Sequence, residues 1–186
     1  MLLLQTPLKI FICILIADFT TGIVHWWEDA YGNPNWKYLG KSVVLPNLEH
    51  HQKPRAFLQG NFFERIKLSL FVASAICLLL YIFGCNNMFV FFTLLYMSLA
   101  NEIHAISHRT DKENGKLICF IQKTGLLQTR KMHGLHHTSP YNVNYCVMTG
   151  FLNPVLNVIK FWYVIEWGFA KIGIKTIRCS EVRNGY

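Results

Sequence analysis

Charged residues are scarce in this sequence, and the common motifs of soluble enzymes are missing from it. Only 15% of its 186 residues are charged, against about 25% in an ordinary soluble domain. No P-loop, dinucleotide-binding glycine fingerprint or GxSxG elbow occurs, so nothing supports those nucleotide-binding or hydrolase classes. None of the six cysteines stands in a CxxC pair, which predicts free thiols instead of a zinc knuckle or a disulfide framework.

The composition that is present favours a membrane protein. Hydrophobic residues make up 52% of the chain, and the formal net charge is +8 at pH 7. A basic protein of this kind fits a surface of anionic lipid headgroups. Nucleic acid is excluded as the expected partner, because the basic residues flank apolar runs and do not form a stripe on a polar surface.

Three apolar runs are long enough to cross or enter a bilayer, at residues 10–27, 66–83 and 88–108. The third is 21 residues long, about 30 Å as a helix. No small-x-small cleavage site follows the first run, so we expect a retained helix and not a signal peptide. A fourth run, residues 151–174, predicts a helix that lies at the interface or packs on the site. It is not a clean span, because it is interrupted by Pro154, Lys160, Glu166 and Lys171. The expected fold is an all-α integral membrane bundle, with residues 1–186 as one domain.

The loops between these runs predict the orientation. Residues 84–87 form a short uncharged connection, so residues 66 and 108 must lie on the same side of the membrane. The long loops on that side carry eleven lysines and arginines between Lys37 and Lys131. The positive-inside rule places this side in the cytosol. The membrane expected is a bacterial inner membrane or the endoplasmic reticulum.

All eight histidines fall on that cytosolic side, in three stretches at residues 25–51, 101–108 and 130–140. Scattered core or surface histidines have no reason to segregate in this way. Two pairs stand four residues apart, His104 with His108 and His25 with Asp29, which brings each pair onto one helical face. His133 and His136 stand three apart, which also predicts one helical face, and His50 and His51 are adjacent. Eight imidazoles exceed what one metal needs, so two metal ions are predicted, of zinc, copper, iron or nickel.

Three polar residues inside the apolar runs have two interpretations. Asp18 and Asn101 either orient metal-binding imidazoles or form hydrogen bonds between helices. For Glu102 we favour the bond between helices. Trp26, Trp27 and Trp36 are interpreted as interfacial anchors.

Four stretches together resemble the plasmanylethanolamine desaturase family of membrane lipid desaturases. They are ADFTTGIVHWWEDAYG (residues 17–32), EHHQKP (49–54), NEIHAISH (101–108) and RKMHGLHHTSPYNVNYCVMTGFLN (130–153). Their order and spacing match over roughly residues 10–165. Each stretch alone is unspecific, and the combination is specific.

The resemblance implies a di-iron, oxygen-dependent enzyme that converts the sn-1 alkyl ether of a phospholipid to a vinyl ether. It implies electrons from a small donor protein, a b-type cytochrome or a ferredoxin, and a phospholipid substrate from the bilayer. Zinc or another transition metal is expected to be able to replace iron. Asp29 matches an acidic position that is a ligand or orients one. The implied metal ligands are His25, His50, His51, His104, His108, His133, His136 and His137.

Two departures from the family pattern concern different parts of the protein. Met132 stands where some members have another histidine, which predicts that this position is dispensable for the metal site. The sequence also begins at the first apolar run, whereas animal members have a hydrophobic segment before it. That difference bears on the substrate channel more than on the metal site.

Two alternatives remain open from the sequence. A related di-iron acyl-lipid desaturase or hydroxylase would use the same ligands, because the outcome depends on which C–H bonds approach the metal. A membrane metal-binding or metal-transport protein is the second alternative, although a transporter would hold its ligands near the bilayer midplane.

Overall fold

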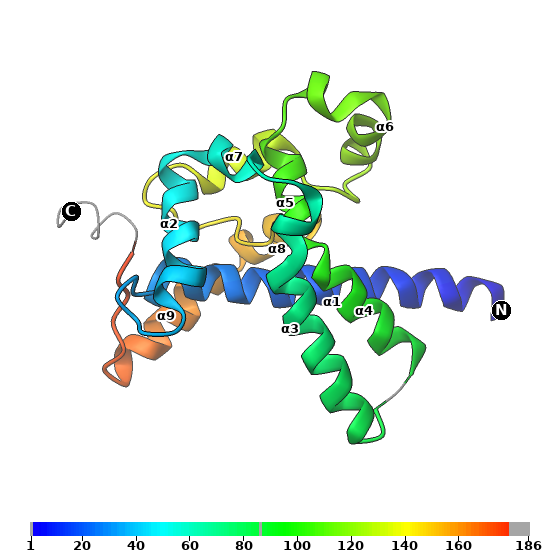
Figure 1. Ribbon diagram of the computed structural model, residues 1–186, viewed down its shortest axis with the longest axis horizontal. Coiled ribbons are helices and arrows are strands. Elements are labelled where there is room, and N and C mark those ends of the chain that lie inside the picture. The colour runs from blue at the N-terminus through cyan, green and yellow to red at the C-terminus, as the bar shows by residue number, and fades with distance from the viewer. Residues whose placement is uncertain (1, 86, 179–186) are drawn as a thin grey trace.

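The computed structural model describes residues 2–85 and 87–178, and every regular element within them is a helix (Figure 1). This confirms the all-helical prediction. The α-helices are α1 (Leu2–Tyr31), α2 (Leu45–Gln52), α3 (Phe62–Ile82), α4 (Met88–Ser98), α5 (Ala100–His108), α6 (Asp111–Lys123), α7 (Arg130–His136), α8 (Leu152–Val158) and α9 (Phe161–Lys171). A π-helical turn, η1 (Gly40–Val44), precedes α2, and a 3-10 turn, η2 (Pro54–Leu58), follows it.

Helix α1 is longer than the apolar run that predicted it, and it carries the first histidine near its end. It is apolar enough to cross a membrane over Gln5–Tyr31. The helix stops at Gly32, whose backbone N–H donates to the Glu28 carbonyl at 3.1 Å. A Cβ on Gly32 would lie 2.3 Å from that same oxygen, so only glycine allows the chain to turn away here.

Helices α3 and α4 form the predicted hairpin and pack against each other (Figure 1). Asn61 and Glu64 form a capping box at the start of α3, and the Asn87 side chain caps α4 by accepting from two backbone N–H groups. These caps satisfy donors that a helix start would otherwise leave without a partner. The caps therefore fix where each arm of the hairpin begins.

The third apolar run is not one straight helix, contrary to expectation. It is bent by 42° between α4 and α5, where the Leu99 N–H bonds to the Tyr96 carbonyl. The Ser69 hydroxyl of α3 donates to the Ser98 carbonyl at 2.7 Å. A side chain on the neighbouring helix thus satisfies a backbone oxygen at the bend. Two helices are long enough to cross a membrane, or three if the bent pair counts as one span.

The outer face of the α3–α4 hairpin is apolar and exposed. Phe63, Phe71, Phe83 and Met88 each expose 69–74% of their surface. A soluble monomer rarely exposes so large an apolar patch, whereas lipid tails would cover it at no cost. The exposure agrees with a membrane protein.

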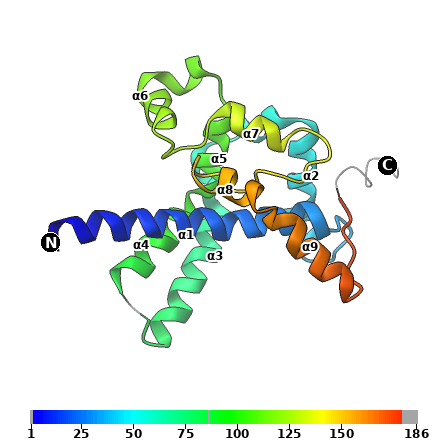
Figure 2. The same cartoon turned by 180° about the vertical axis from the view of Figure 1, so that it is seen from behind.

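The fourth apolar run was predicted as one helix, at the interface or packed on the site, and it is instead two helices. The chain breaks at Lys160, which has a left-handed conformation (φ 52°) between α8 and α9. Helix α8 lies beside α1, and α9 runs obliquely away from it (Figure 2). Trp162, near the start of α9, stacks on Trp26 of α1. Trp26 is only 4% exposed and its Nε1–H donates to Glu166 at 2.9 Å, so its prediction as an interfacial anchor was wrong. Glu166, which read as an interruption, is the partner that allows an indole to be buried.

The free-thiol prediction is confirmed for the five cysteines at Cys13, Cys77, Cys85, Cys119 and Cys146. The sixth, Cys179, lies outside the described residues.

Candidate metal centre

Five histidines from three helices converge in one group. Each offers a ring nitrogen, and these nitrogens all lie within 4.8 Å of one another. Helix α5 supplies two of them from successive turns, as their spacing predicted. The members are His50, His104, His108, His133 and His137.

The Nε2 atom of His133 lies at the middle of this group. It is 2.8 Å from the Nε2 of His104, 2.9 Å from that of His108 and 3.0 Å from that of His137. A ring nitrogen has one in-plane site, which holds either a proton or a lone pair. One such site cannot form hydrogen bonds to three neighbours in three directions. Nitrogens about 2.1 Å from a shared metal ion would be about 3 Å apart, so the donor set fits a metal ion and not a hydrogen-bonded cluster.

A second group adjoins the first and contains a carboxylate. Its members His25, Asp29, His51 and His136 offer ligand atoms that also lie within 4.8 Å of one another. Asp29 Oδ1 is 2.9 Å from His51 Nε2, and Asp29 Oδ2 is 3.3 Å from His136 Nε2. All four residues are buried. The α1 pair, His25 and Asp29, stays together as the four-residue spacing predicted.

Neighbouring histidines in the sequence are divided between the two groups. His50 of α2 belongs to the first group and His51 to the second. His133 of α7 and His137, directly after α7, belong to the first group, whereas His136 of α7 belongs to the second. We expected His133 and His136 to share a face, but the four-residue pair is His133 with His137. Helices α2 and α7 each contact both groups because consecutive side chains on a helix point about 100° apart.

Backbone carbonyls fix the ring orientation of three of these histidines. The Nδ1–H groups of His25, His50 and His136 donate to the carbonyls of Tyr145, Asn47 and Val143, at 3.2, 3.0 and 2.9 Å. A carbonyl can only accept, so Nδ1 carries the proton and Nε2 keeps its lone pair. The Nε2 atoms of His25 and His50 are buried without a hydrogen-bond partner in the described chain. Metal-binding histidines commonly donate their other ring N–H to a backbone carbonyl in this way.

The environment keeps His50, His133 and His137 neutral. Burial, followed by the neighbouring imidazoles His136 and His51, lowers the pKa of His137 to about 2. Burial and the other histidines hold the pKa values of His50 and His133 well below the ordinary range. A neutral imidazole is the form that binds a metal, so these residues are ready to bind at neutral pH.

Asp18 and Asn101 lie outside both groups and join segments of the chain. The buried Asp18 carboxylate accepts from the N–H groups of Met148 and Thr149, at 2.9 and 3.0 Å, and from the Thr149 hydroxyl at 2.6 Å. Asn101 donates to the Arg65 carbonyl at 3.1 Å. Asp18 therefore ties α1 to the segment that carries the Tyr145 carbonyl, and so acts on His25 through the backbone. Asn101 ties α5 to α3.

Glu102 also joins helices, as its favoured interpretation predicted. Its carboxylate pairs with Arg65 of α3 at 2.6 Å and with Arg109, just beyond α5, at 2.7 Å. These bonds hold the end of α5, and with it His108, against the hairpin.

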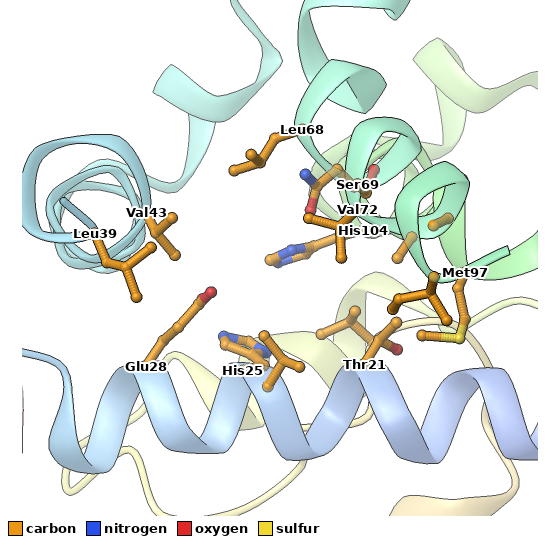
Figure 3. A pocket seen from close by; sticks show the side chains of 16 residues that line it. Thr21, His25, Glu28, Leu39, Val43, Leu68, Ser69, Val72, Met97 and His104 are labelled. Carbon is orange, nitrogen blue, oxygen red and sulfur yellow. The ribbon is translucent and has the colours of Figure 1, made fainter. Parts of the chain in front are cut away.

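An apolar cavity of about 290 Å³ connects the histidines with the lipid-facing surface between α1 and α3 (Figure 3). His104 from the first group and His25 from the second both line it. Val24, Leu68 and Val72 line it as well and are 41–49% exposed, so the cavity opens where lipid would lie. One apolar chamber thus reaches both groups of ligands.

Sequence reasoning missed several residues that shape the site. Asn47 donates to Asp29 Oδ1 at 2.6 Å, and its own carbonyl orients His50. Its position three residues before His50 was the available signal. The carbonyls of Val143 and Tyr145 carry no sequence signal, because any residue has one. Glu28 lines the cavity, and its place beside Asp29, directly after the first apolar run, was the signal that went unused.

Comparisons of the sequence with known proteins identify the family. A model of the lipid desaturase domain matches residues 14–177. A probable fatty acid desaturase of Acanthamoeba polyphaga mimivirus is 31% identical over 86% of this chain and 80% of its own. Plasmanylethanolamine desaturases are 32% identical in Myxococcus xanthus, over 82% of this chain, and 31% identical in Mus musculus, over 87%. The match covers 56% and 65% of the lengths of those two proteins.

No solved structure matches the chain. The family model spans most of the sequence and includes every residue of the two ligand groups. The resemblance read from the four motifs is thereby confirmed. The chain belongs to the lipid desaturase domain family.

Proposed function

We propose that the protein is a membrane di-iron, oxygen-dependent desaturase that converts the sn-1 alkyl ether of a phospholipid to a vinyl ether. One observation carries the proposal: two adjoining groups of side chains, whose spacing and donor atoms fit metal ions, meet at the inner end of an apolar cavity that opens toward lipid. The named plasmanylethanolamine desaturases among the relatives support the choice of an ether lipid.

The ligands assigned to the two ions follow from the two groups. One ion would be held by His50, His104, His108, His133 and His137, and the other by His25, Asp29, His51 and His136. Imidazole and carboxylate suit iron, and they also suit zinc or another transition metal as a substitute. The bound iron would supply the oxidising power that removes hydrogen from an unactivated chain, which side-chain acids and bases cannot supply.

The protein's own part is to place the chain and keep water away. The cavity walls are aliphatic on α1, η1 and α3, so an alkyl chain is the group they would bind. His25 and His104 lie where the cavity meets the ligand groups. A carbon held there would be close to both proposed ions, while the rest of the chain stays among apolar side chains.

We assign the ligand side of the molecule to the cytosol, on the basis of the basic loops. His137 is the one ligand of the first group that is not fully buried, which supports electron delivery at this surface. A small donor protein, a b-type cytochrome or a ferredoxin, would supply the electrons.

Acyl desaturation is the second candidate, and specific relatives favour it. The mimivirus relative is named a probable fatty acid desaturase, and a chloroplastic fatty acid desaturase 4 of Arabidopsis thaliana is 28% identical over 90% of this chain. An acyl-lipid enzyme would use the same ligand groups and the same cavity.

Lipid analysis of cells that express the protein and contain alkyl lipids tests the proposal. We expect acid-labile vinyl ethers to appear, and about two irons per chain in the purified protein. The matched control is His108→Ala, which should insert in the membrane and form no product. If only acyl unsaturation changes, the second candidate replaces the first; one zinc per chain with no lipid product would overturn both.

A further inference from the structure

We propose that Glu28 is a substrate-recognition residue whose carboxyl accepts a hydrogen bond from the polar end of the lipid. This rests on the proposed lipid desaturase function and specifies which lipids the cavity prefers. The preferred substrate would carry a hydrogen-bond donor, an ammonium or a hydroxyl, at its polar end.

Glu28 lies on the wall of the cavity. It stands on α1 one residue before Asp29 and three after His25, and its side chain points into the cavity across from η1 and His104 (Figure 3). The side chain is half-buried. It lies on the part of the cavity wall formed by α1 and η1, which includes Val43 and Leu39.

Glu28 differs from the other polar side chains on the cavity wall in its hydrogen bonding. The other non-histidine polar side chains on the cavity wall already have acceptors: Thr21 donates to the Ala17 carbonyl, Ser69 to Ser98 and Asn101 to Arg65. Among the side chains and backbone groups that the structure describes, none donates to the Glu28 carboxyl. A carboxyl in an apolar cavity without a donor loses hydration and gains nothing in return.

An acid inside an apolar segment is costly and usually has a functional partner. The metal groups do not supply that partner, since Glu28 belongs to neither. A bound lipid with a donor group would satisfy the carboxyl, and one without it would leave the carboxyl desolvated and unpaired. Sites of this kind discriminate strongly, because the cost falls only on the wrong ligand.

The donor can come from two parts of a phospholipid, the ammonium of an ethanolamine headgroup or the free sn-2 hydroxyl of a lyso lipid. The two differ in what they need from Glu28. An ammonium needs the negative charge, whereas a hydroxyl needs only an acceptor oxygen, which glutamine retains. Comparing Glu28→Gln with Glu28→Leu therefore separates the two sources.

Lipid retention by the purified protein, measured by native mass spectrometry, tests the proposal without relying on turnover. The probes are four 1-O-hexadecyl lipids: ethanolamine or choline headgroup, each with an sn-2 acyl chain or a free hydroxyl. We expect the natural protein to prefer the donor-bearing lipid by roughly tenfold, the size of one charge-assisted hydrogen bond. Glu28→Leu should abolish that preference. Thr21→Val is the matched control from the same wall, and its preference should match that of the natural protein.

Each outcome decides a point. An ethanolamine preference lost in both variants assigns the ammonium, and a lyso preference kept in Glu28→Gln assigns the hydroxyl. Equal retention of all four lipids, or a preference unchanged in Glu28→Leu, overturns the proposal. Loss of bound iron in Glu28→Gln would make the carboxyl part of the metal centre and would also overturn it. Failure of the proposed function looks different: the lipid preference is present, and no desaturated product forms with any probe.

Discussion

The Nε2 atoms of His104 and His133 lie 2.8 Å apart, although 29 residues separate them in the chain. His133 also lies within 3.0 Å of the Nε2 atoms of His108 and His137. His133→Ala would remove the nitrogen at the middle of the first group. We expect the metal content to fall from about two ions to about one per chain, and desaturation to fall by more than a hundredfold. Elemental analysis and product assay check this; unchanged metal content would contradict the ligand assignment.

Asp29 should be as necessary for metal binding in the second group as His133 is in the first. Asp29→Ala removes the carboxylate that bridges His51 and His136, so it should also reduce the metal content to about one ion. Asn47→Ala keeps the carboxylate and removes only the donor that holds Oδ1. Loss of a side chain that forms a hydrogen bond to a metal ligand typically lowers metal affinity by about 10–100-fold. A titration with Fe²⁺ should therefore show weaker binding at one site in Asn47→Ala. Equal affinity in Asn47→Ala and the natural protein would be evidence against that role.

Met132 tests how much of the family pattern this site needs. It precedes His133 but belongs to neither ligand group, and its backbone carbonyl accepts from the Asn144 side chain at 3.0 Å. Met132→His should leave the metal content at about two ions and change activity by less than about threefold. A third ion, or a large gain in activity, would mean that the two groups are incomplete without a histidine here.

Asp18 should matter for stability more than for metal affinity. Asp18→Ala would leave the buried N–H groups of Met148 and Thr149 without an acceptor, at a cost of about 1–3 kcal/mol for each unsatisfied group. Asp18→Asn retains one oxygen, so it should lose less. Thermal denaturation in detergent should rank the natural protein above Asp18→Asn and Asp18→Ala. The reverse ranking, or no change, would show that these hydrogen bonds contribute little.

The sequence predicted most of the helices and the residues of the site. It did not predict how those residues divide between the two ligand groups. Apolar run length located α1, α3 and α4, because a span needs a long, nearly uncharged stretch. The four-residue spacings of His104 with His108 and of His25 with Asp29 survive in the structure, because they depend only on local helix geometry. Each of these features is a property of a short stretch of chain.

The features that were missed depend on contacts between distant segments. The division of His50 from His51 follows from where α2 packs against α1 and α5. The burial of Trp26 required Glu166, 140 residues away, and the bend at Ser98 is matched by Ser69 of another helix. The break at Lys160 was also not predicted. Lys160 has a left-handed backbone conformation there, which amino-acid composition does not indicate.

Gly22 gives the last prediction, because it sets how closely α1 approaches the segment that orients His25. A Cβ on Gly22 would lie 2.7 Å from Cys146 Sγ and 3.2 Å from the Cys146 backbone. The Asn153 side chain accepts from the Cys146 N–H and donates to the Cys146 carbonyl, so this backbone is fixed in place. Overpacking of a held core costs about 1–3 kcal/mol, and any shift also moves the Tyr145 carbonyl away from His25. Gly22→Ala should therefore unfold at lower temperature and bind the second metal ion more weakly.

Gly134→Ala is the matched control, because it makes the same change inside α7 where a new Cβ would meet nothing within 4 Å. Alanine favours a helix over glycine by about 0.5–1 kcal/mol, so this variant should be as stable as the natural protein or slightly more so, with both ions retained. Thermal denaturation and iron content measured on both variants decide the question. If Gly22→Ala behaves like Gly134→Ala, then the close approach of α1 to Cys146 does not hold the second ligand group in place.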